Sequence, residues 1–250
     1  MKVQVIDFHG HVGRWDAYAM IDDQARMLAA MDLVGIDRSV VFNIFHADGR
    51  TGNDETAAFI ARCPDRFVGF AYLSPVLPPD ALRTELTRCI DELGFRGIKL
   101  YPPSAPWPLH HERWFPIYAF ADERALPVLF HTGTEPHALP RYLNEIAPRF
   151  PRAFFVAGHS GNVDPPRQEA IAAAQAHPNI YLETCSSFRT PGVIEELVER
   201  AGADRVLFGS DTPLMDPRVQ LGKIITAAIP PAAKRMLLGE NAARLLRLLP

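Results

Sequence analysis

The stretch PDALRTELTRCIDELGFRGIKLYPP (79–103) contains one complete helix-to-strand unit. Residues 79–94 carry apolar side chains near helical spacing and end in Gly94, which suits the end of a helix. The apolar run FRGIKLY (95–101) follows and stops at a proline-rich loop. This order predicts an amphipathic helix and a buried strand, as found in a parallel sheet covered by helices.

The same unit recurs along the chain, because short apolar runs alternate with stretches of helical composition. Consecutive runs begin roughly 25 to 35 residues apart, which is the room that a strand, a helix and two loops need. The eight runs are VQVIDF (3–8), RSVVFN (38–43), RFVGFAYL (66–73), FRGIKLY (95–101), LPVLFH (126–131), AFFVAGH (153–159), NIYLET (179–184) and RVLFGSD (205–211). We therefore expect an α/β fold, a (β/α)₈ TIM barrel that forms a single domain over residues 1–250. An open doubly wound sheet uses the same units, but eight evenly spaced repeats favour closure.

The composition of the chain argues against some classes of binding partner. A formal net charge of −3 over 250 residues gives no basic surface for nucleic acid or an anionic membrane. No apolar run approaches the 18 or so residues that span a bilayer, and the residues before the first strand do not resemble a secretory leader, so we expect neither membrane insertion nor secretion. Three widely spaced cysteines indicate neither a disulfide framework nor a cysteine-rich zinc site. We expect a cytoplasmic protein with a small-molecule substrate; the sequence does not indicate the oligomeric state.

Residue types that can ligate a metal lie at or near the ends of six predicted strands. In a barrel of this type the carboxyl ends of the strands form the functional face. The residues are Asp7, His9 and His11 after the first strand, Lys99 in the fourth, His131 after the fifth, His159 after the sixth, Glu183 in the seventh and Asp211 after the eighth. Any one of these histidines alone is more often structural. Together, an HxH pair, two further strand-end histidines and an aspartate favour a bound divalent cation.

Strand alternation also predicts which way the side chains of the first strand point. Residues i and i+2 point to the same side, so Asp7, His9 and His11 should share one face. Ile6 and Phe8 should then face the helices. In this arrangement Asp7 sits one layer beneath the histidines and orients an imidazole by accepting its hydrogen bond.

At this point the sequence resembles the amidohydrolase superfamily, and more narrowly its amidohydrolase 2 branch of metal-dependent hydrolases, lactonases and decarboxylases. The matching stretches are IDFHGH (6–11), DRFVGFAYLSP (65–75), ELGFRGIKLYPP (92–103), LPVLFHTGT (126–134), VAGHSGN (156–162), ADRVLFGSDTPL (203–214) and LLGENAARLL (237–246). The resemblance implies a (β/α)₈ barrel with a metal held by His9, His11, His131 and Asp211. His159 would lie at a second metal or act on substrate or water. Zinc is the expected metal, with manganese, iron or cobalt as alternatives, and one metal is favoured over two.

Lys99 has three interpretations. In binuclear members of the superfamily a lysine of the fourth strand is carboxylated and bridges two metals, and the setting IKLYP resembles that arrangement. An unmodified Lys99 could instead contact an anionic group of the substrate. The structural alternative is an ion pair with Glu183 in the barrel mouth.

The expected activity is hydrolysis of an amide, ester or lactone in a small carboxylated or cyclic substrate. A bound cation would activate water, Asp211 would transfer its proton, and His159 would stabilise the oxyanion. One alternative keeps the metal but changes the reaction to nonoxidative decarboxylation of an aromatic or unsaturated acid. The other is a catalytically silent metal-binding barrel.

Loop residues give weaker indications of substrate contact. Arg14 and Trp15 follow the HxH pair and could meet a substrate carboxylate and ring, although both could equally pack against a helix. His137 lies in the loop after the fifth predicted strand, on the functional side of the barrel. Glu183 is a further candidate for substrate contact if it is not paired with Lys99.

Overall fold

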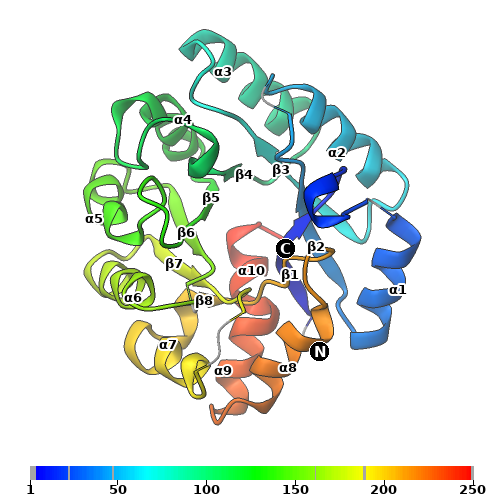
Figure 1. Cartoon of the computed structure of the whole chain (residues 1–250), viewed down its shortest axis with the longest axis vertical. Helices are drawn as coiled ribbons and strands as arrows, with labels where there is room; N and C mark the ends of the chain where they lie inside the picture. The colour runs from blue at the N-terminus through cyan, green and yellow to red at the C-terminus, as the bar shows by residue number, and fades with distance from the viewer. Residues whose placement is uncertain (1–3, 22, 47, 161, 188–189, 249–250) are drawn as a thin grey trace.

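The computed structural model describes residues 4–21, 23–46, 48–160, 162–187 and 190–248. Its centre is an eight-stranded parallel sheet in which the strands follow chain order. The strands are β1 (Ile6–His11), β2 (Arg38–Phe42), β3 (Phe67–Tyr72), β4 (Gly97–Leu100), β5 (Pro127–His131), β6 (Phe154–Gly158), β7 (Ile180–Glu183) and β8 (Val206–Leu207). Figure 1 shows the helices arranged around these strands. The predicted single-domain (β/α)₈ barrel is confirmed.

A helix follows each strand along the chain. The α-helices are α1 (Gln24–Val34), α2 (Thr51–Ala61), α3 (Pro79–Thr87), α4 (Phe115–Arg124), α5 (Leu143–Ile146), α6 (Pro166–Ala176), α7 (Val193–Ala201), α8 (Pro217–Thr226), α9 (Pro231–Arg235) and α10 (Asn241–Leu245). Helix α1 shows how local sequence sets these bounds. The Asp23 carboxylate accepts a hydrogen bond from the backbone N–H of Arg26 at its start, and Gly35 ends it with a φ of 78°.

Shorter helical segments connect these elements. The 3₁₀ segments are η1 (Asp16–Tyr18), η3 (Pro102–Ser104), η4 (Glu112–Trp114), η5 (Pro140–Tyr142), η6 (Ala147–Arg149) and η7 (Ala203–Arg205). Two π-helical segments, η2 (Arg88–Glu92) and η8 (Met236–Glu240), continue the helices that precede them. The last of these joins α9 to α10 in one continuous helical run.

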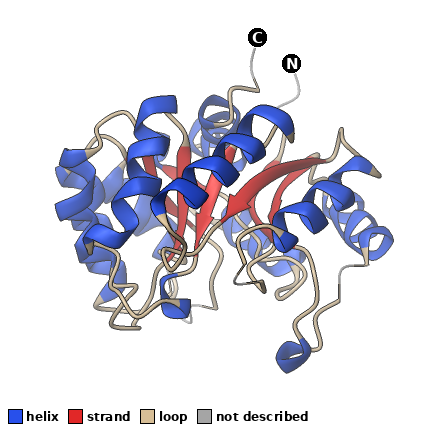
Figure 2. Cartoon of the chain, turned by 90° about the horizontal axis from the view of Figure 1, so that it is seen from above, coloured by secondary structure: helices blue, strands red, loops and turns tan. Residues whose placement is uncertain are grey.

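Two hydrophobic layers hold the barrel together. Strand side chains such as Ile98, Phe130 and Leu182 pack outward against helices. Alternate side chains such as Leu129 and Val156 fill the barrel interior, together with residues of α10. Figure 2 shows both chain ends on one side of the barrel and most of the long loops on the opposite side. None of the described helices is long and apolar enough to cross a bilayer.

Strand β1 departs from the predicted alternation. Ile6 and Phe8 belong to the interior layer, so the expectation that they face the helices is wrong. The pairing of β1 with β2 shifts register between Asp7 and Gly10. This irregularity turns two consecutive side chains, Phe8 and His9, inward, and it directs Asp7 sideways toward the neighbouring strands.

The seam between β8 and β1 closes the barrel through irregular contacts. The His11 backbone N–H donates to the Thr212 carbonyl at 2.7 Å, and the Asp211 N–H donates to the His9 carbonyl at 2.7 Å. These two hydrogen bonds place Asp211 directly beside the HxH pair. They also join residues that lie 201 and 202 positions apart in the chain.

Candidate metal centre and active site

Three donor atoms converge at the seam between β1 and β8. His11 Nε2 lies 2.9 Å from Asp211 Oδ1, and His9 Nε2 lies 3.4 Å from the same oxygen. All three residues are buried, and their ligand atoms lie within 4.8 Å of one another. The structure therefore brings together the HxH pair and the strand-end aspartate.

Glu183 orients the His9 ring from the layer beneath. Its Oε2 atom lies 3.0 Å from His9 Nδ1, so the Nδ1–H donates to the carboxylate and leaves the Nε2 lone pair facing Asp211. The backbone N–H groups of His159 and Cys185 and the Cys185 thiol also donate to Glu183. Glu183 is thus a positioning residue below the cavity.

Asp7 does not have the predicted orienting role, and the hydrogen bonds of its carboxylate explain why. It accepts from the Ser210 N–H, from the hydroxyls of Ser210 and Ser39, and from the backbone N–H of His9. The imidazole acceptor that we expected at Asp7 is supplied by Glu183. Asp7 ties β1 to its neighbours β2 and β8.

The three converging groups have the protonation states that a metal requires. Burial lowers the pKa of His9 well below its usual value, and the charge of Lys99 lowers it further. Burial likewise lowers the pKa of His11. Burial alone would raise the pKa of Asp211, but the hydrogen bond from His11 and the nearby imidazoles hold it well below its usual value. Two neutral imidazoles and a carboxylate, gathered in one buried place, are a donor set suited to a divalent cation.

Backbone strain marks two of the predicted catalytic residues. His159 and Asp211 both have a φ of 61°, in the left-handed region that side chains other than glycine rarely adopt. Each such residue costs about 1–3 kcal/mol, and these conformations gather at functional sites. Both residues line the cavity at the carboxyl ends of the strands.

Lys99 lies at the floor of the site. Its Nζ atom is 3.1 Å from His9 Nε2 and 4.7 Å from the centroid of the Phe42 ring. Burial lowers the pKa of this ammonium to about 8. Among the described residues Lys99 forms no ion pair with Glu183, so the structural alternative for Lys99 is wrong.

The remaining strand-end histidines, His131 and His159, lie at the ends of β5 and β6. His159 Nδ1 donates to the Cys185 carbonyl at 2.9 Å, which leaves Nε2 as the free ring nitrogen. Burial, with a contribution from the charge of His131, lowers the pKa of His159 to about 4. The ring centroids of His131 and His159 are 4.7 Å apart, but His131 Nε2 faces Glu135 at 3.4 Å. His131 therefore lies outside the converging group of three.

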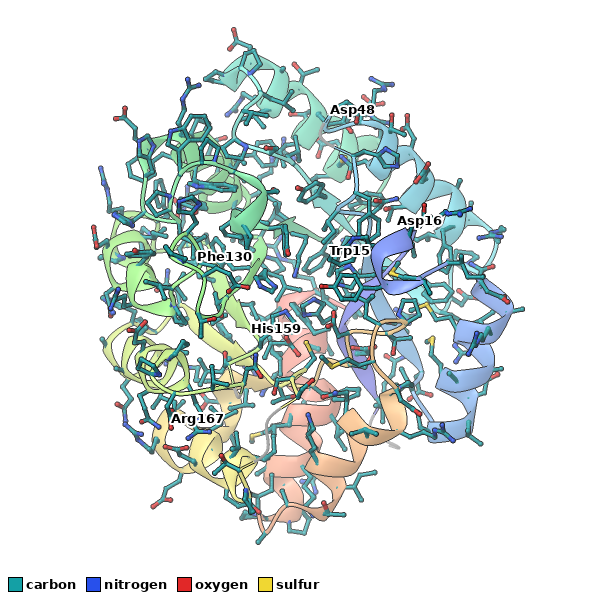
Figure 3. All side chains as sticks on the ribbon, in the orientation of Figure 1. Trp15, Asp16, Asp48, Phe130, His159 and Arg167 are labelled. Carbon is teal, nitrogen blue, oxygen red and sulfur yellow. The ribbon has the colours of Figure 1, made fainter. Side chains whose placement is uncertain are left out.

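A cavity of about 350 Å³ opens over these groups. This volume lies in the range of small-molecule sites, about 300–1,000 Å³. Its wall includes the rings of Trp15, Tyr18 and Tyr101 and the carboxylate of Glu135. Figure 3 shows Trp15 and His159 near the centre of the view and Arg167 toward its rim.

The loop candidates fall in different places. Trp15 lines the cavity and its ring centroid lies 4.4 Å from that of Tyr18. Arg14 is exposed and pairs with Asp16 at 2.5 Å, so the structure does not bring it to the cavity. His137 Nδ1 donates to the Ala105 carbonyl, and His137 does not line the cavity.

Sequence reasoning missed several residues of the site. Tyr18, Tyr101, Glu135, Asn162, Leu214 and Met215 line the cavity, and Cys185 lies beneath it. Tyr101 follows the fourth strand directly, so its strand-end position was a usable signal. The others are ordinary loop residues whose positions depend on how the loops fold.

Comparison with known proteins places this site in a family. The sequence profile described as amidohydrolase matches residues 6–248. The chain belongs to this amidohydrolase family. This match confirms the family resemblance that the sequence motifs indicated.

The curated relatives of this chain are mostly decarboxylases. The γ-resorcylate decarboxylase of Rhodococcus jostii is 28% identical over 252 residues, which cover 80% of this chain and 76% of that protein. Four γ-resorcylate decarboxylases match, and the chain spans 65–78% of their lengths. The crystal structure of a 2,6-dihydroxybenzoate decarboxylase with 2,6-dihydroxybenzoate superposes with a TM-score of 0.79 at 20% identity, covering 98% of this chain and 99% of that one. A dihydroxybenzoic acid decarboxylase from Polaromonas sp. JS666, with manganese and 2-nitroresorcinol, gives a TM-score of 0.78 at 20% identity and covers 98% and 97%.

These relatives overturn the expectation of a hydrolase. They are named decarboxylases, which agrees with the alternative reaction and not with cleavage of an amide, ester or lactone. The error has a physical cause, because the same imidazole and carboxylate ligands hold a metal that activates water or one that binds a substrate carboxylate. A divalent metal is supported by the family match and by the converging donors, whereas zinc in particular is not.

Proposed function

We propose that the protein is a metal-dependent nonoxidative decarboxylase of a small hydroxylated aromatic acid. The observation that carries the proposal is the convergence of His9, His11 and Asp211 beside Lys99, on the floor of a cavity with aromatic walls. The similarity to γ-resorcylate decarboxylases supports the choice of reaction. Small-molecule ligands in related crystal structures support the choice of substrate class.

We propose one divalent cation for each chain, held by His9 Nε2, His11 Nε2 and Asp211, with His131 as a further ligand. Imidazole and carboxylate donors accept zinc and manganese alike. When bound, the cation would supply positive charge that holds the carboxylate and an adjacent hydroxyl oxygen of the substrate. Metal analysis of the purified protein identifies the ion.

Lys99 and the aromatic walls bind the substrate in this proposal. An unmodified Lys99 Nζ, buried at the floor of the cavity, attracts the substrate carboxylate. The rings of Trp15 and Tyr101 face the same cavity and offer apolar surface to an aromatic ring. An intact mass without added carbon dioxide on Lys99 is the expected result, and a carboxylated lysine would contradict it.

Asp211 transfers the proton in the proposed reaction. Decarboxylation breaks the bond between the ring and the carboxylate, and a new C–H bond forms at the same ring carbon. In this proposal the Asp211 oxygen that does not hold the cation takes a proton from solvent and gives it to the ring carbon. Solvent returns the proton after carbon dioxide leaves, so one proton is consumed in each turnover.

His159 positions the substrate in the same proposal. Its Nδ1–H is committed to the Cys185 carbonyl, so Nε2 remains free to accept a hydrogen bond from a ring hydroxyl. The low pKa of His159, about 4, keeps this nitrogen unprotonated near neutral pH. The ring thus selects acids that carry a hydroxyl group.

The experiment is a turnover assay with the metal-loaded protein. Zinc- and manganese-loaded samples are incubated with 2,6-dihydroxybenzoate and with a panel of other hydroxybenzoates. We expect release of one carbon dioxide for each phenolic product, loss of activity with a chelator and recovery when metal is restored. A folded, metal-loaded protein that releases no carbon dioxide from any member of the panel would contradict the proposal.

A further inference from the structure

A second cavity adjoins the proposed active site. We call it the annex; its volume is about 620 Å³, and it lies between residues 18–21 and 23, helix α1 and residues 212–218. Its walls are largely apolar and include Met20, Met27, Ala30 and Leu33. The annex is thus larger than the cavity over the metal ligands, and its walls are more apolar.

The annex and the active-site cavity share part of their walls. Tyr18, Leu214 and Met215 line both. The backbone N–H groups of Leu214 and Met215 donate to the Asp211 carbonyl at 2.8 and 3.1 Å, so these two residues belong to the turn that carries the proposed proton donor. Methionine and leucine side chains adapt readily to a ligand. The boundary between the cavities therefore includes side chains that can move aside.

Apolar groups around the annex are left exposed. Tyr18 is 66% exposed, Ile21 is 57% exposed and Leu33 is 70% exposed. Contiguous exposed apolar surface in soluble proteins marks binding sites. At the rim of the annex, the charge of Arg218 is already paired with Asp216. An apolar group entering the annex would cover this surface without separating a charge from its partner.

We propose that the annex holds an apolar arm of the substrate. The acid group and ring occupy the cavity over His9, His11 and Asp211, and an alkyl substituent passes between Tyr18 and the Leu214–Met215 pair into the annex. This inference rests on the proposed decarboxylase function and narrows the substrate class to alkyl-substituted hydroxybenzoates. Its basis is the wall of Tyr18, Leu214 and Met215 that the two cavities share, which a separate binding partner would not require.

The test compares hydroxybenzoates with alkyl chains from methyl to hexyl, placed at each free ring position. Burial of one methylene tightens binding by about fourfold. For the ring position that points to the annex, we expect kcat/KM to rise by about this factor for each of the first few methylenes. No dependence on chain length at any ring position would overturn the inference.

A matched pair of variants locates the effect. Ala29 and Ala58 are both exposed helical alanines, on α1 and α2, but only Ala29 lines the annex. We expect Ala29→Trp to keep the rate on the unsubstituted acid within about twofold and to abolish the gain from the alkyl chain, whereas Ala58→Trp keeps both. A gain that survives in Ala29→Trp, or a change in molecular mass by light scattering without loss of the gain, would overturn the inference.

The design separates the two proposals. If no acid is decarboxylated, the proposed function fails, and calorimetric binding of the same acids then decides the annex. Affinity that grows with chain length in the wild type but not in Ala29→Trp would support the annex. Affinity independent of chain length would reject it.

Discussion

Replacing Glu183 with glutamine should weaken metal binding without changing any ligand. In the native structure the two carboxylate oxygens accept hydrogen bonds from His9 Nδ1, from the backbone N–H groups of His159 and Cys185, and from the Cys185 thiol. An amide nitrogen must take the place of one oxygen. It would then face either the Cys185 N–H or the His9 Nδ1–H, and both of these are donors.

The size of the effect follows from the burial of this group. Glu183 is fully buried, and its Oε1 packs so closely against Gly209 that a Cβ added to this glycine would collide with it. The amide group of a glutamine therefore has no room to move away. If the nitrogen faces His9, the imidazole loses its orienting acceptor. Loss of such a partner typically weakens metal affinity by about 10- to 100-fold, or about 1.4–2.7 kcal/mol.

The assay is a titration of the metal-free protein with zinc or manganese, followed by calorimetry or chelator competition. Glu85→Gln is the matched control, because Glu85 on α3 is also a buried glutamate but pairs with Arg88 of η2, away from the site. Both variants should lose stability, and only Glu183→Gln should lose metal affinity. Equal metal affinities in the two variants would refute the orienting role of Glu183.

Three further predictions address the other groups of the site. Asp211→Asn, assayed at saturating metal, should lower kcat by about 10²- to 10⁴-fold because it removes the proton donor, and near-normal turnover would reject that role. Lys99→Met should lower kcat/KM by about 10- to 100-fold, chiefly through KM, because a charged hydrogen bond to the substrate is lost; an unchanged KM would argue against contact with the acid group. His159→Asn suits the left-handed backbone and tests the pH dependence of the metal-free protein. The native pKa of His159, about 4, lies below the value of 6.5 of an unperturbed histidine, so the unfolded chain binds more protons between these pH values. The free energy of unfolding of the wild type should therefore rise with pH across this window, by up to about 1.4 kcal/mol per pH unit more than that of the variant, and parallel curves for the two proteins would contradict the shifted pKa.

The repeating pattern of the sequence was sufficient for the fold, because eight buried strands separated by amphipathic helices have few other ways to bury their apolar faces. The residues of the metal group could also be proposed, since strand ends of a barrel meet at one edge. The sidedness of β1 could not be predicted. A register shift between Asp7 and Gly10 reverses the alternation; Gly10 is a residue type that often marks such irregularities, but it does not indicate which side chains turn inward.

The acceptor for His9 was missed for a related reason. Glu183 lies 174 residues away from His9 in the chain, and only the closed barrel brings their side chains together. Arg14 was misplaced because its local partner, Asp16, holds it at the surface. The reaction type was misjudged because hydrolases and decarboxylases of this family share the strand-end ligands that the sequence displays.

The most direct test of the proposed function is isotopic. The metal-loaded protein is incubated with a hydroxybenzoate in D₂O, and the product is analysed by mass spectrometry and NMR. The proposed reaction predicts one equivalent of carbon dioxide and a phenol with a single deuterium at the ring carbon that lost the carboxylate. Unchanged acid in the presence of folded, metal-loaded protein, for every hydroxybenzoate and for both metals, would contradict it.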